Sequence, residues 1–266
     1  MISFLIIVPT LDSYDLLPAL VASLKAQTFP HWRVHFVDGP SGERHREYLE
    51  LLCKQDLRFS YSYQDSNELG IFGAMNQGIR FAEAEKDWIL FWGSDDKAAS
   101  PSVLETIAKK LRDYNEVNDS PDLLICEGIY YHLNANIIRP NQQLLGRESK
   151  FFLRHSFRRS LFWGSTPPHQ ATFFGPGAIS YLARFSSLFS LSADLDYFLR
   201  ISTFPKIKVR VERIQVVWMG DAGISNQQTK QRLKEVRMAY KMAFRNQWWI
   251  PFFLRYIQRI QSIVKL

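Results

Sequence analysis

Short apolar runs alternate with amphipathic helical patterns through the first half of the chain. A buried strand of a parallel sheet reads as a continuous apolar run, and parallel strands need a crossover that is usually a helix. The pattern therefore predicts an α/β domain with a mostly parallel, Rossmann-like sheet flanked by helices. The expected strands are Phe4–Val8, Val34–Val37, Phe59–Tyr63, Trp88–Trp92 and Leu123–Cys126, and the expected helices are Leu16–Leu24, Glu43–Lys54, Ile71–Ala84 and Pro101–Tyr114.

The alternation becomes less regular after residue 127. The segment Ile129–Arg139 fits a hairpin or an irregular excursion, and residues 140–168 show no clear periodicity. No repeat or linker argues for a second independent domain, so we expect one domain over residues 1–225 and a helical tail over 226–266. Further expected elements are strands at His169–Phe174 and Ile207–Val217 and helices at Pro176–Phe185, Asp194–Ser202 and Gln227–Phe244.

Two aspartates, Asp95 and Asp96, follow the apolar run Trp88–Trp92. Ligands of open α/β sheets bind at the carboxyl ends of the strands. Two hard oxygen donors that repel each other there suit a divalent cation such as Mg²⁺ or Mn²⁺. The alternative is that both aspartates begin a loop and cap the helix that opens at Pro101.

Two more expected strands also end in polar segments, Pro9–Asp12 and Asp38–Ser41. The carboxyl ends of parallel strands share one edge, so these side chains converge with Asp95 and Asp96 on a crevice of the kind that binds nucleotides. The chain has no glycine-rich phosphate loop, because Gly70–Gly73 does not closely follow a strand and no Gly-Lys-Ser/Thr sequence occurs. A cation on the two aspartates could neutralise phosphate charge instead.

In their order and spacing, these segments resemble the family 2 glycosyltransferases, which have the GT-A fold. The resemblance covers residues 1–225 and implies a nucleotide-sugar-binding half over 1–126 and an acceptor-side half over 127–225. The matching segments are Val8–Thr10, Gln27–Phe29, Val37–Gly39, Gly70–Ile79, Ser94–Asp96, His169–Phe174 and Ala193–Arg200.

The resemblance implies a metal-dependent, inverting transfer of a sugar from a nucleotide-diphosphate sugar to a hydroxyl of a glycan or polyprenyl-linked acceptor. The resemblance also implies a role in the synthesis of bacterial-type surface polysaccharide. The implied cofactor is Mg²⁺ or Mn²⁺. The implied donor-binding residues are Pro9, Thr10, Leu11, Asp12, Asp38, Asn76, Ser94 and Asp95, the metal ligands Asp95 and Asp96, the general base Asp194, and an acceptor-side residue His169.

Three of these assignments have plain structural alternatives. Asp194 lies near an expected helix start, where an aspartate often serves as a cap. His169 could be an ordinary hydrogen-bonded loop residue, and Asn76 could lie on a helix surface. Asp196 is expected to pair with Arg200, four residues along the same helix.

Two positions depart from the family pattern. Gly93 stands where many relatives have Asp or Asn, and Met75 stands where some have a basic residue. These departures leave the donor nucleotide open and allow a second hypothesis, a non-catalytic nucleotide-sugar-binding or membrane scaffold protein. A sugar nucleotidyltransferase is a third, although the glycine-rich basic loop that such an enzyme needs near the first strand is missing.

The tail carries the basic charge of the chain. Residues 230–266 hold nine Lys or Arg and one acid, Glu235, whereas the whole chain has a net charge of +7. On a helix from Pro251, the apolar residues Phe253, Ile257, Ile260 and Val264 form one stripe and Arg255, Gln258, Arg259 and Ser262 another. This pattern predicts contact with an anionic membrane surface, and the alternative is a tail packed on the domain. No nucleic-acid recognition module is present.

The compartment follows from the cysteines and the first residues. Cys53 and Cys126 lie in apolar settings and form no disulfide framework, which is typical of a reducing compartment. The run Phe4–Val8 lacks a basic flank and is too short to be a signal peptide or a membrane span. We therefore expect a cytoplasmic protein held peripherally on the inner face of the plasma membrane.

Overall fold

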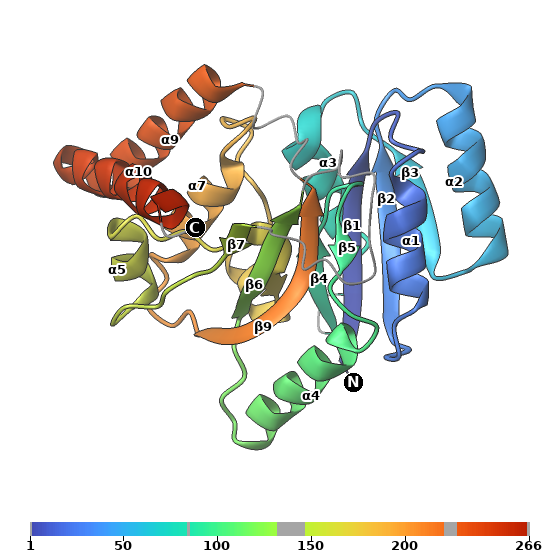
Figure 1. The fold of residues 1–266 in the computed structure, drawn as a ribbon, viewed down its shortest axis with the longest axis horizontal. Coiled ribbons are helices and arrows are strands. Elements are labelled where there is room, and N and C mark those ends of the chain that lie inside the picture. The colour runs from blue at the N-terminus through green and yellow to red at the C-terminus, as the bar shows by residue number, and fades with distance from the viewer. Residues whose placement is uncertain (1, 84–85, 132–146, 221–227, 265–266) are drawn as a thin grey trace.

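The computed structural model describes residues 2–83, 86–131, 147–220 and 228–264 of the 266-residue chain (Figure 1). These residues form an α/β domain around one sheet. The strand order is β3-β2-β1-β4-β8-β6-β9-β5, and β7 pairs with β6 outside this path. The strands are β1 (Ser3–Thr10), β2 (Trp32–Asp38), β3 (Phe59–Tyr63), β4 (Asp87–Phe91), β5 (Lys97–Ala98), β6 (Leu123–Tyr131), β7 (Arg147–Ser149), β8 (Thr172–Phe174) and β9 (Val209–Gly220).

Helices cover both faces of the sheet and give it two hydrophobic cores. One core receives α1, α2 and α4, and the other receives α3, α5, α6, α7 and α9. Burial on both faces explains why β1 and β4 read as continuous apolar runs. The helices are α1 (Leu17–Lys25), α2 (Glu43–Gln55), α3 (Gly70–Ile79), α4 (Val103–Glu116), α5 (Phe157–Phe162), α6 (Pro176–Tyr181), α7 (Ala193–Ile201), α9 (Thr229–Phe244) and α10 (Trp249–Val264), with 3₁₀ turns η1 (His169–Ala171) and η2 (Arg245–Gln247).

The predicted parallel sheet is confirmed over its first half. β1 pairs in parallel with β2 and β4, and β2 with β3. The second half is mixed, because the short β8 lies between β4 and β6 and runs antiparallel to both. Its neighbour β6 pairs in parallel with β9.

Several predicted boundaries were wrong. The strand expected at His169–Phe174 begins as the turn η1, and only its last three residues pair in the sheet. The helix expected at Pro176–Phe185 ends at Tyr181, where the next residue turns to extended backbone. Helix α3 ends at Ile79, before the predicted end at Ala84. The predicted excursion Ile129–Arg139 lies outside the described residues beyond Tyr131.

The carboxyl ends of β1, β2, β4 and β9 meet at one edge of the sheet, the upper edge in Figure 1. The register aligns Thr10 with Asp38. The bridge between β5 and β9 pairs Lys97 with Trp218, so the chain just beyond β4 lies beside the end of β9. This edge therefore gathers the polar segments predicted from the sequence.

The tail packs on the domain on the side of α5 and α7 (Figure 1). Helix α9 contacts α7, and α10 contacts both α9 and α5. Pro251 is buried and Phe252 packs against the second core, whereas Phe253 and Ile257 stay exposed. Among the described residues, no helix has the length and apolar character needed to cross a bilayer.

Candidate active site

Asp38 lies buried at the end of β2, and one of its carboxylate oxygens is fully engaged. Oδ1 accepts hydrogen bonds from Thr10 Oγ1 at 2.9 Å and Ser41 Oγ at 2.7 Å, and His45 Nε2 lies 3.0 Å from the same atom. The other oxygen, Oδ2, is buried and has no hydrogen-bond partner among the described residues. A buried polar atom without a partner is costly, so Oδ2 is suited to accept from a ligand.

The loops after β1 and β2 are fastened to each other. Asp12 Oδ1 accepts from the backbone N–H of Gly42 at 2.7 Å, and the Asp12 N–H donates to Ser41 Oγ at 2.9 Å. Asp12 has a positive φ of 46°, a conformation that aspartate tolerates better than most residues. Leu11, beside it, leaves 56% of its surface exposed. The two loops thus form one wall of the crevice.

The loop after β4 joins the same wall. Ser13 Oγ donates to Ser94 Oγ at 2.8 Å, and Ser94 Oγ donates to the carbonyl of Pro9 at 3.3 Å. The structure therefore brings together the predicted donor-binding residues of three strand ends. These are Pro9, Thr10, Leu11, Asp12, Asp38, Ser94 and Asp95.

Asp96 is the buried member of the acidic pair. Its Oδ2 accepts the backbone N–H of Gly93 at 2.6 Å, and its Oδ1 is buried without a hydrogen-bond partner among the described residues. Burial, and then the charge of neighbouring Asp95, raise the pKa of Asp96 well above its ordinary value. A bound cation would relieve both effects.

Two glycines make room for Asp95. A Cβ on Gly220, the last residue of β9, would lie 2.0 Å from Asp95 Oδ2, and a Cβ on Gly93 would lie 2.7 Å from Oδ1. The Tyr131 hydroxyl also donates to the Asp95 carbonyl at 2.6 Å. The departure at Gly93 thus has a structural reason, because a side chain there would press on the Asp95 carboxylate. Gly220 was missed in the sequence, since only its long-range position gives it a role.

Asp194 and His169 form a second polar cluster. Asp194 Oδ2 lies 3.7 Å from His169 Nδ1, and the two side chains keep 23% and 22% of their surface exposed. Burial tends to raise the pKa of Asp194, but the contact with His169 and the charges of His169 and Arg255 outweigh it and lower that pKa. Asp194 is in the first turn of α7, and Ser192, the N-cap residue of this helix, makes no side-chain cap hydrogen bond. It is therefore an ionised, partly accessible carboxylate.

Comparison with known proteins identifies the family to which this chain belongs. The model of the family described as Glycosyl transferase family 2 matches residues 5–174. The chain belongs to glycosyltransferase family 2.

Relatives and solved structures agree with that family. A PGL/p-HBAD biosynthesis glycosyltransferase of Mycobacterium tuberculosis is 25% identical over 244 residues, covering 91% of this chain and 87% of the relative. TarS 1–349 of S. aureus in complex with UDP-GlcNAc has a TM-score of 0.64 at 17% identity, over 92% of this chain and 68% of that one. The mannosyltransferase PcManGT of Pyrobaculum calidifontis, in complex with GDP-Man and Mn²⁺, has a TM-score of 0.63 at 13% identity, over 94% of this chain and 69% of that one.

The fold predicted from the sequence is thereby confirmed as that of the GT-A glycosyltransferases. The chain spans 39% of a longer TarS chain. In the part of this family 2 chain that the structure describes, no group of three or more His, Cys, Asp or Glu side chains could hold a metal ion.

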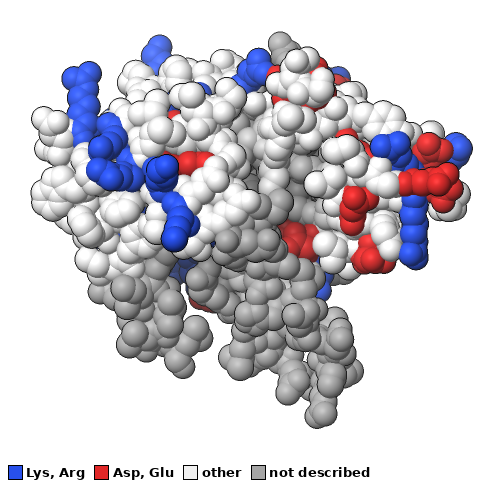
Figure 2. All heavy atoms as spheres, turned by 90° about the horizontal axis from the view of Figure 1, so that it is seen from above, with Lys and Arg blue, Asp and Glu red and all other residues white. Residues whose placement is uncertain are grey.

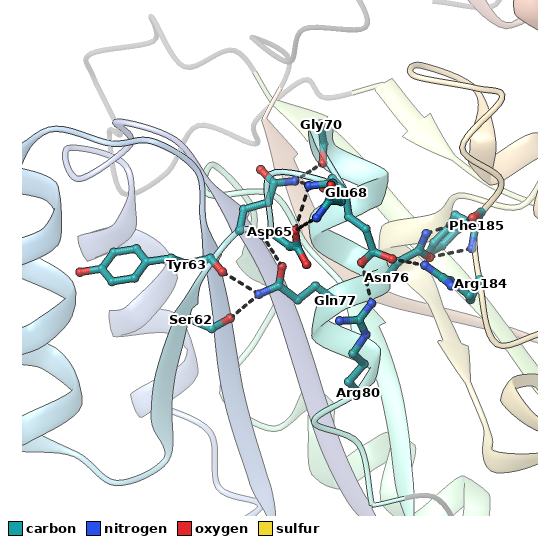
Figure 3. A network of polar contacts seen from close by, with 12 residues as sticks. Ser62, Tyr63, Asp65, Glu68, Gly70, Asn76, Gln77, Arg80, Arg184 and Phe185 are labelled. Atoms are coloured by element: carbon teal, nitrogen blue, oxygen red, sulfur yellow. Dashed lines mark hydrogen bonds and ion pairs between the residues drawn. The ribbon is translucent and has the colours of Figure 1, made fainter.

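Asn76, a predicted donor-binding residue of this glycosyltransferase, uses its side chain to hold another loop. Its Oδ1 accepts from the Phe185 N–H at 2.8 Å and its Nδ2 donates to the Phe185 carbonyl at 3.0 Å (Figure 3). Arg184, the preceding residue, pairs with Glu68. These contacts border a cavity of about 660 Å³ between the start of α3 and the segment 184–190. The donor-binding role of Asn76 stays a prediction.

Gln77 fixes the loop between β3 and α3. Its Nε2 donates to Ser62 Oγ at 3.0 Å and to the Tyr63 carbonyl at 2.7 Å, and its Oε1 accepts from the Asp65 N–H at 2.8 Å (Figure 3). Met75, one residue earlier, is buried in the second core. An apolar residue at position 75 therefore fits the packing of α3.

Glu235 of α9 was missed as a residue of the glycosyltransferase site. Its carboxylate accepts the backbone N–H groups of Ser190 at 3.2 Å, Leu191 at 2.8 Å and Ser192 at 2.9 Å, and also the Ser190 hydroxyl at 2.8 Å. These three residues lead directly into α7 and Asp194. Glu235 is the one acid of the basic tail, and that isolation was the available signal in the sequence.

Proposed function

We propose that this family 2 glycosyltransferase moves a sugar from a nucleotide-diphosphate donor to a hydroxyl group, with a divalent cation and with inversion at the anomeric carbon. Three buried carboxylate oxygens have no hydrogen-bond partner among the described residues: Asp87 Oδ1 at the start of β4, and the two that carry the proposal, Asp38 Oδ2 and Asp96 Oδ1. Both lie at the edge of the sheet where α/β folds bind nucleotides.

The nucleotide would lie along the fastened loops. Asp38 Oδ2 is suited to accept an N–H of the base, because Thr10 and Ser41 already satisfy Oδ1 and hold the carboxylate in place. Leu11 offers exposed apolar surface, while Asp12 and Ser94 hold the wall in shape. The complexes of TarS with UDP-GlcNAc and of PcManGT with GDP-Man are consistent with such a ligand.

Asp95 and Asp96 would hold Mg²⁺ or Mn²⁺. The donor set fits, because Mg²⁺ is commonly bound through one or two carboxylates together with substrate phosphates and water. When bound, the cation supplies positive charge that stabilises the departing diphosphate.

Asp194 would act as the general base. Its ionised carboxylate takes the proton of the acceptor hydroxyl while that oxygen forms a bond to the anomeric carbon. The bond between the anomeric carbon and the diphosphate oxygen breaks on the opposite face, and the nucleoside diphosphate leaves with the bonding electrons. His169 contacts the same carboxylate, so it would help to orient it on the acceptor side.

Replacing Asp96 with Asn tests the cation site. We expect Mn²⁺ to strengthen binding of nucleoside diphosphate to the wild type at least tenfold, and this gain to vanish in Asp96→Asn because a neutral amide binds cations weakly. Calorimetric titration with UDP and GDP, with and without Mn²⁺, measures it. Asp87→Asn is the matched control, since Asp87 is a buried aspartate at the opposite end of β4. An unchanged Mn²⁺ effect in Asp96→Asn would refute the assignment.

The acceptor is proposed to be a glycan or a lipid-linked glycan at a membrane surface. Lys and Arg side chains gather on the left of the face in Figure 2, the side on which Figure 1 places α9 and α10. Exposed Trp249, Phe253 and Ile257 follow one another at helical spacing on α10. Aromatic and apolar residues beside basic ones suit the interface of an anionic membrane. This surface would hold the enzyme on the inner face of the plasma membrane.

A charge placed in this apolar stripe tests the membrane proposal. Phe253→Glu should weaken binding to vesicles that contain phosphatidylglycerol about tenfold or more. The change removes apolar surface that would insert into the membrane, and the new carboxylate is repelled by anionic lipid. Co-sedimentation measures the bound fraction. Leu57→Glu is the control, since Leu57 is 95% exposed but lies before β3, far from the tail in sequence. Equal binding of the Phe253→Glu variant and wild type would count against a membrane role for α10.

A further inference from the structure

Arg255 of α10 turns into the domain, contrary to the sequence prediction that it belongs to an exposed basic stripe. Its Nη1 donates to Thr166 Oγ1. Its Nε is buried and has no hydrogen-bond partner among the described residues. A guanidinium that is partly buried is expensive unless an opposite charge or good acceptors compensate it, so the surroundings of Arg255 need an explanation.

The helix is seated closely at this residue. Gly164 has a positive φ of 81°, and a Cβ there would lie 2.5 Å from the backbone nitrogen of Arg255. The direct approach of the two backbones fixes where the Arg255 side chain starts. Thr166, which it contacts, is three residues before His169 in the segment that leads into η1.

Arg255 reaches Asp194 through this segment, because Arg255 holds Thr166 and the Nδ1 atom of His169 lies 3.7 Å from Asp194 Oδ2. The charged or titratable groups that face Asp194 are His169 from η1 and Arg255 from α10, and Tyr240 of α9 and Tyr256 of α10 lie beside Arg255. Arg255 remains protonated at any physiological pH, whereas a histidine does not. Arg255 therefore adds a permanent positive charge beside Thr166, in the segment that carries His169.

We propose that Arg255 is a positioning residue for Asp194, so that α10 completes the active site: its guanidinium holds Thr166, and thereby the His169 side chain, against the Asp194 carboxylate. The inference rests on the proposed role of Asp194 as the base. It explains why a charged side chain of the tail is buried at this point, which anchoring alone does not require.

The test compares Arg255→Ala and Arg255→Lys with wild type in nucleotide-sugar turnover. We expect Arg255→Ala to lower kcat about tenfold while the KM of the donor changes less than about twofold, because the base rather than the nucleotide pocket is disturbed. Arg255→Lys, which keeps the charge, should recover part of kcat. Arg159→Ala is the control, since Arg159 is an exposed arginine of α5, on which α10 packs.

A second readout follows the titration of the Asp194 carboxyl carbon by NMR, identified by its loss in Asp194→Asn. In Arg255→Ala the titration should move to higher pH, and in Arg159→Ala it should stay in place. Wild-type kcat with an unmoved titration in Arg255→Ala would overturn the inference. A second result would also overturn it: kcat falls in Arg255→Ala, Arg255→Lys does not restore it, and the Asp194 titration does not move. Arg255 would then be only a structural anchor for α10. If Asp194→Asn itself keeps full turnover, the failure lies in the proposed base instead.

Discussion

Asp194→Asn should lower kcat by about 10²–10⁴-fold and leave the affinity for nucleoside diphosphate nearly unchanged. The amide has almost the shape of the carboxylate but cannot take a proton from the acceptor hydroxyl. The lowered pKa of Asp194 means that the wild-type group is already ionised at neutral pH. Release of nucleoside diphosphate in the presence of acceptor measures turnover, and calorimetry measures binding.

Asp196→Asn is the matched control for this prediction. Asp196 lies on the same helix and forms an ion pair with Arg200 at 2.7 Å, as predicted from their spacing. Its loss should reduce stability, because Arg200 loses its partner, and should leave most of kcat in the folded enzyme. Wild-type turnover in Asp194→Asn would remove Asp194 from the mechanism.

Glu235→Ala should lower the free energy of unfolding by about 2–3 kcal/mol, the largest loss of stability that we expect from a single substitution in α9. The change leaves the backbone N–H groups of Ser190, Leu191 and Ser192 without their acceptor. Urea unfolding followed by circular dichroism measures the loss. A variant that unfolds at the wild-type urea concentration would show that the carboxylate contributes nothing.

The contribution of Glu235 to the free energy of unfolding also depends on pH. Burial tends to raise its pKa, but hydrogen bonds from Leu191 and Ser190 outweigh burial, so the pKa lies below the ordinary 4.5. The stabilisation is therefore complete above about pH 4.5 and is lost as the pH falls through the folded-state pKa. Glu235→Gln keeps the volume and removes this group's titration, so its unfolding should depend less steeply on pH below 4.5.

The first half of the fold was predictable because it is encoded locally. The strands β1, β2 and β4 are buried on both faces and read as apolar runs, and parallel order then places Asp38, Asp95 and Asp96 at one edge. The short β8 was not predictable as an antiparallel insertion, because three residues carry no signal of their partners.

The remaining parts of the site depend on contacts between distant segments. Glu235 reaches a loop more than forty residues earlier, and Arg255 reaches Thr166 across 89 residues. Gly220 matters only because the end of β9 meets the loop after β4. Residue type and local spacing carry no information on such pairings, whereas the nucleotide side of the site follows from strand ends alone.

We propose that the edge formed by β1, β2 and β4 binds a nucleoside diphosphate with a divalent cation. The most direct measurement is a crystal structure with Mn²⁺ and whichever of UDP, GDP and dTDP raises the melting temperature most. We expect an N–H of the base to donate to Asp38 Oδ2 and a Mn²⁺ ion to lie between the diphosphate and the Asp95–Asp96 pair. A nucleotide bound elsewhere, or a metal with no contact to either aspartate, would contradict it.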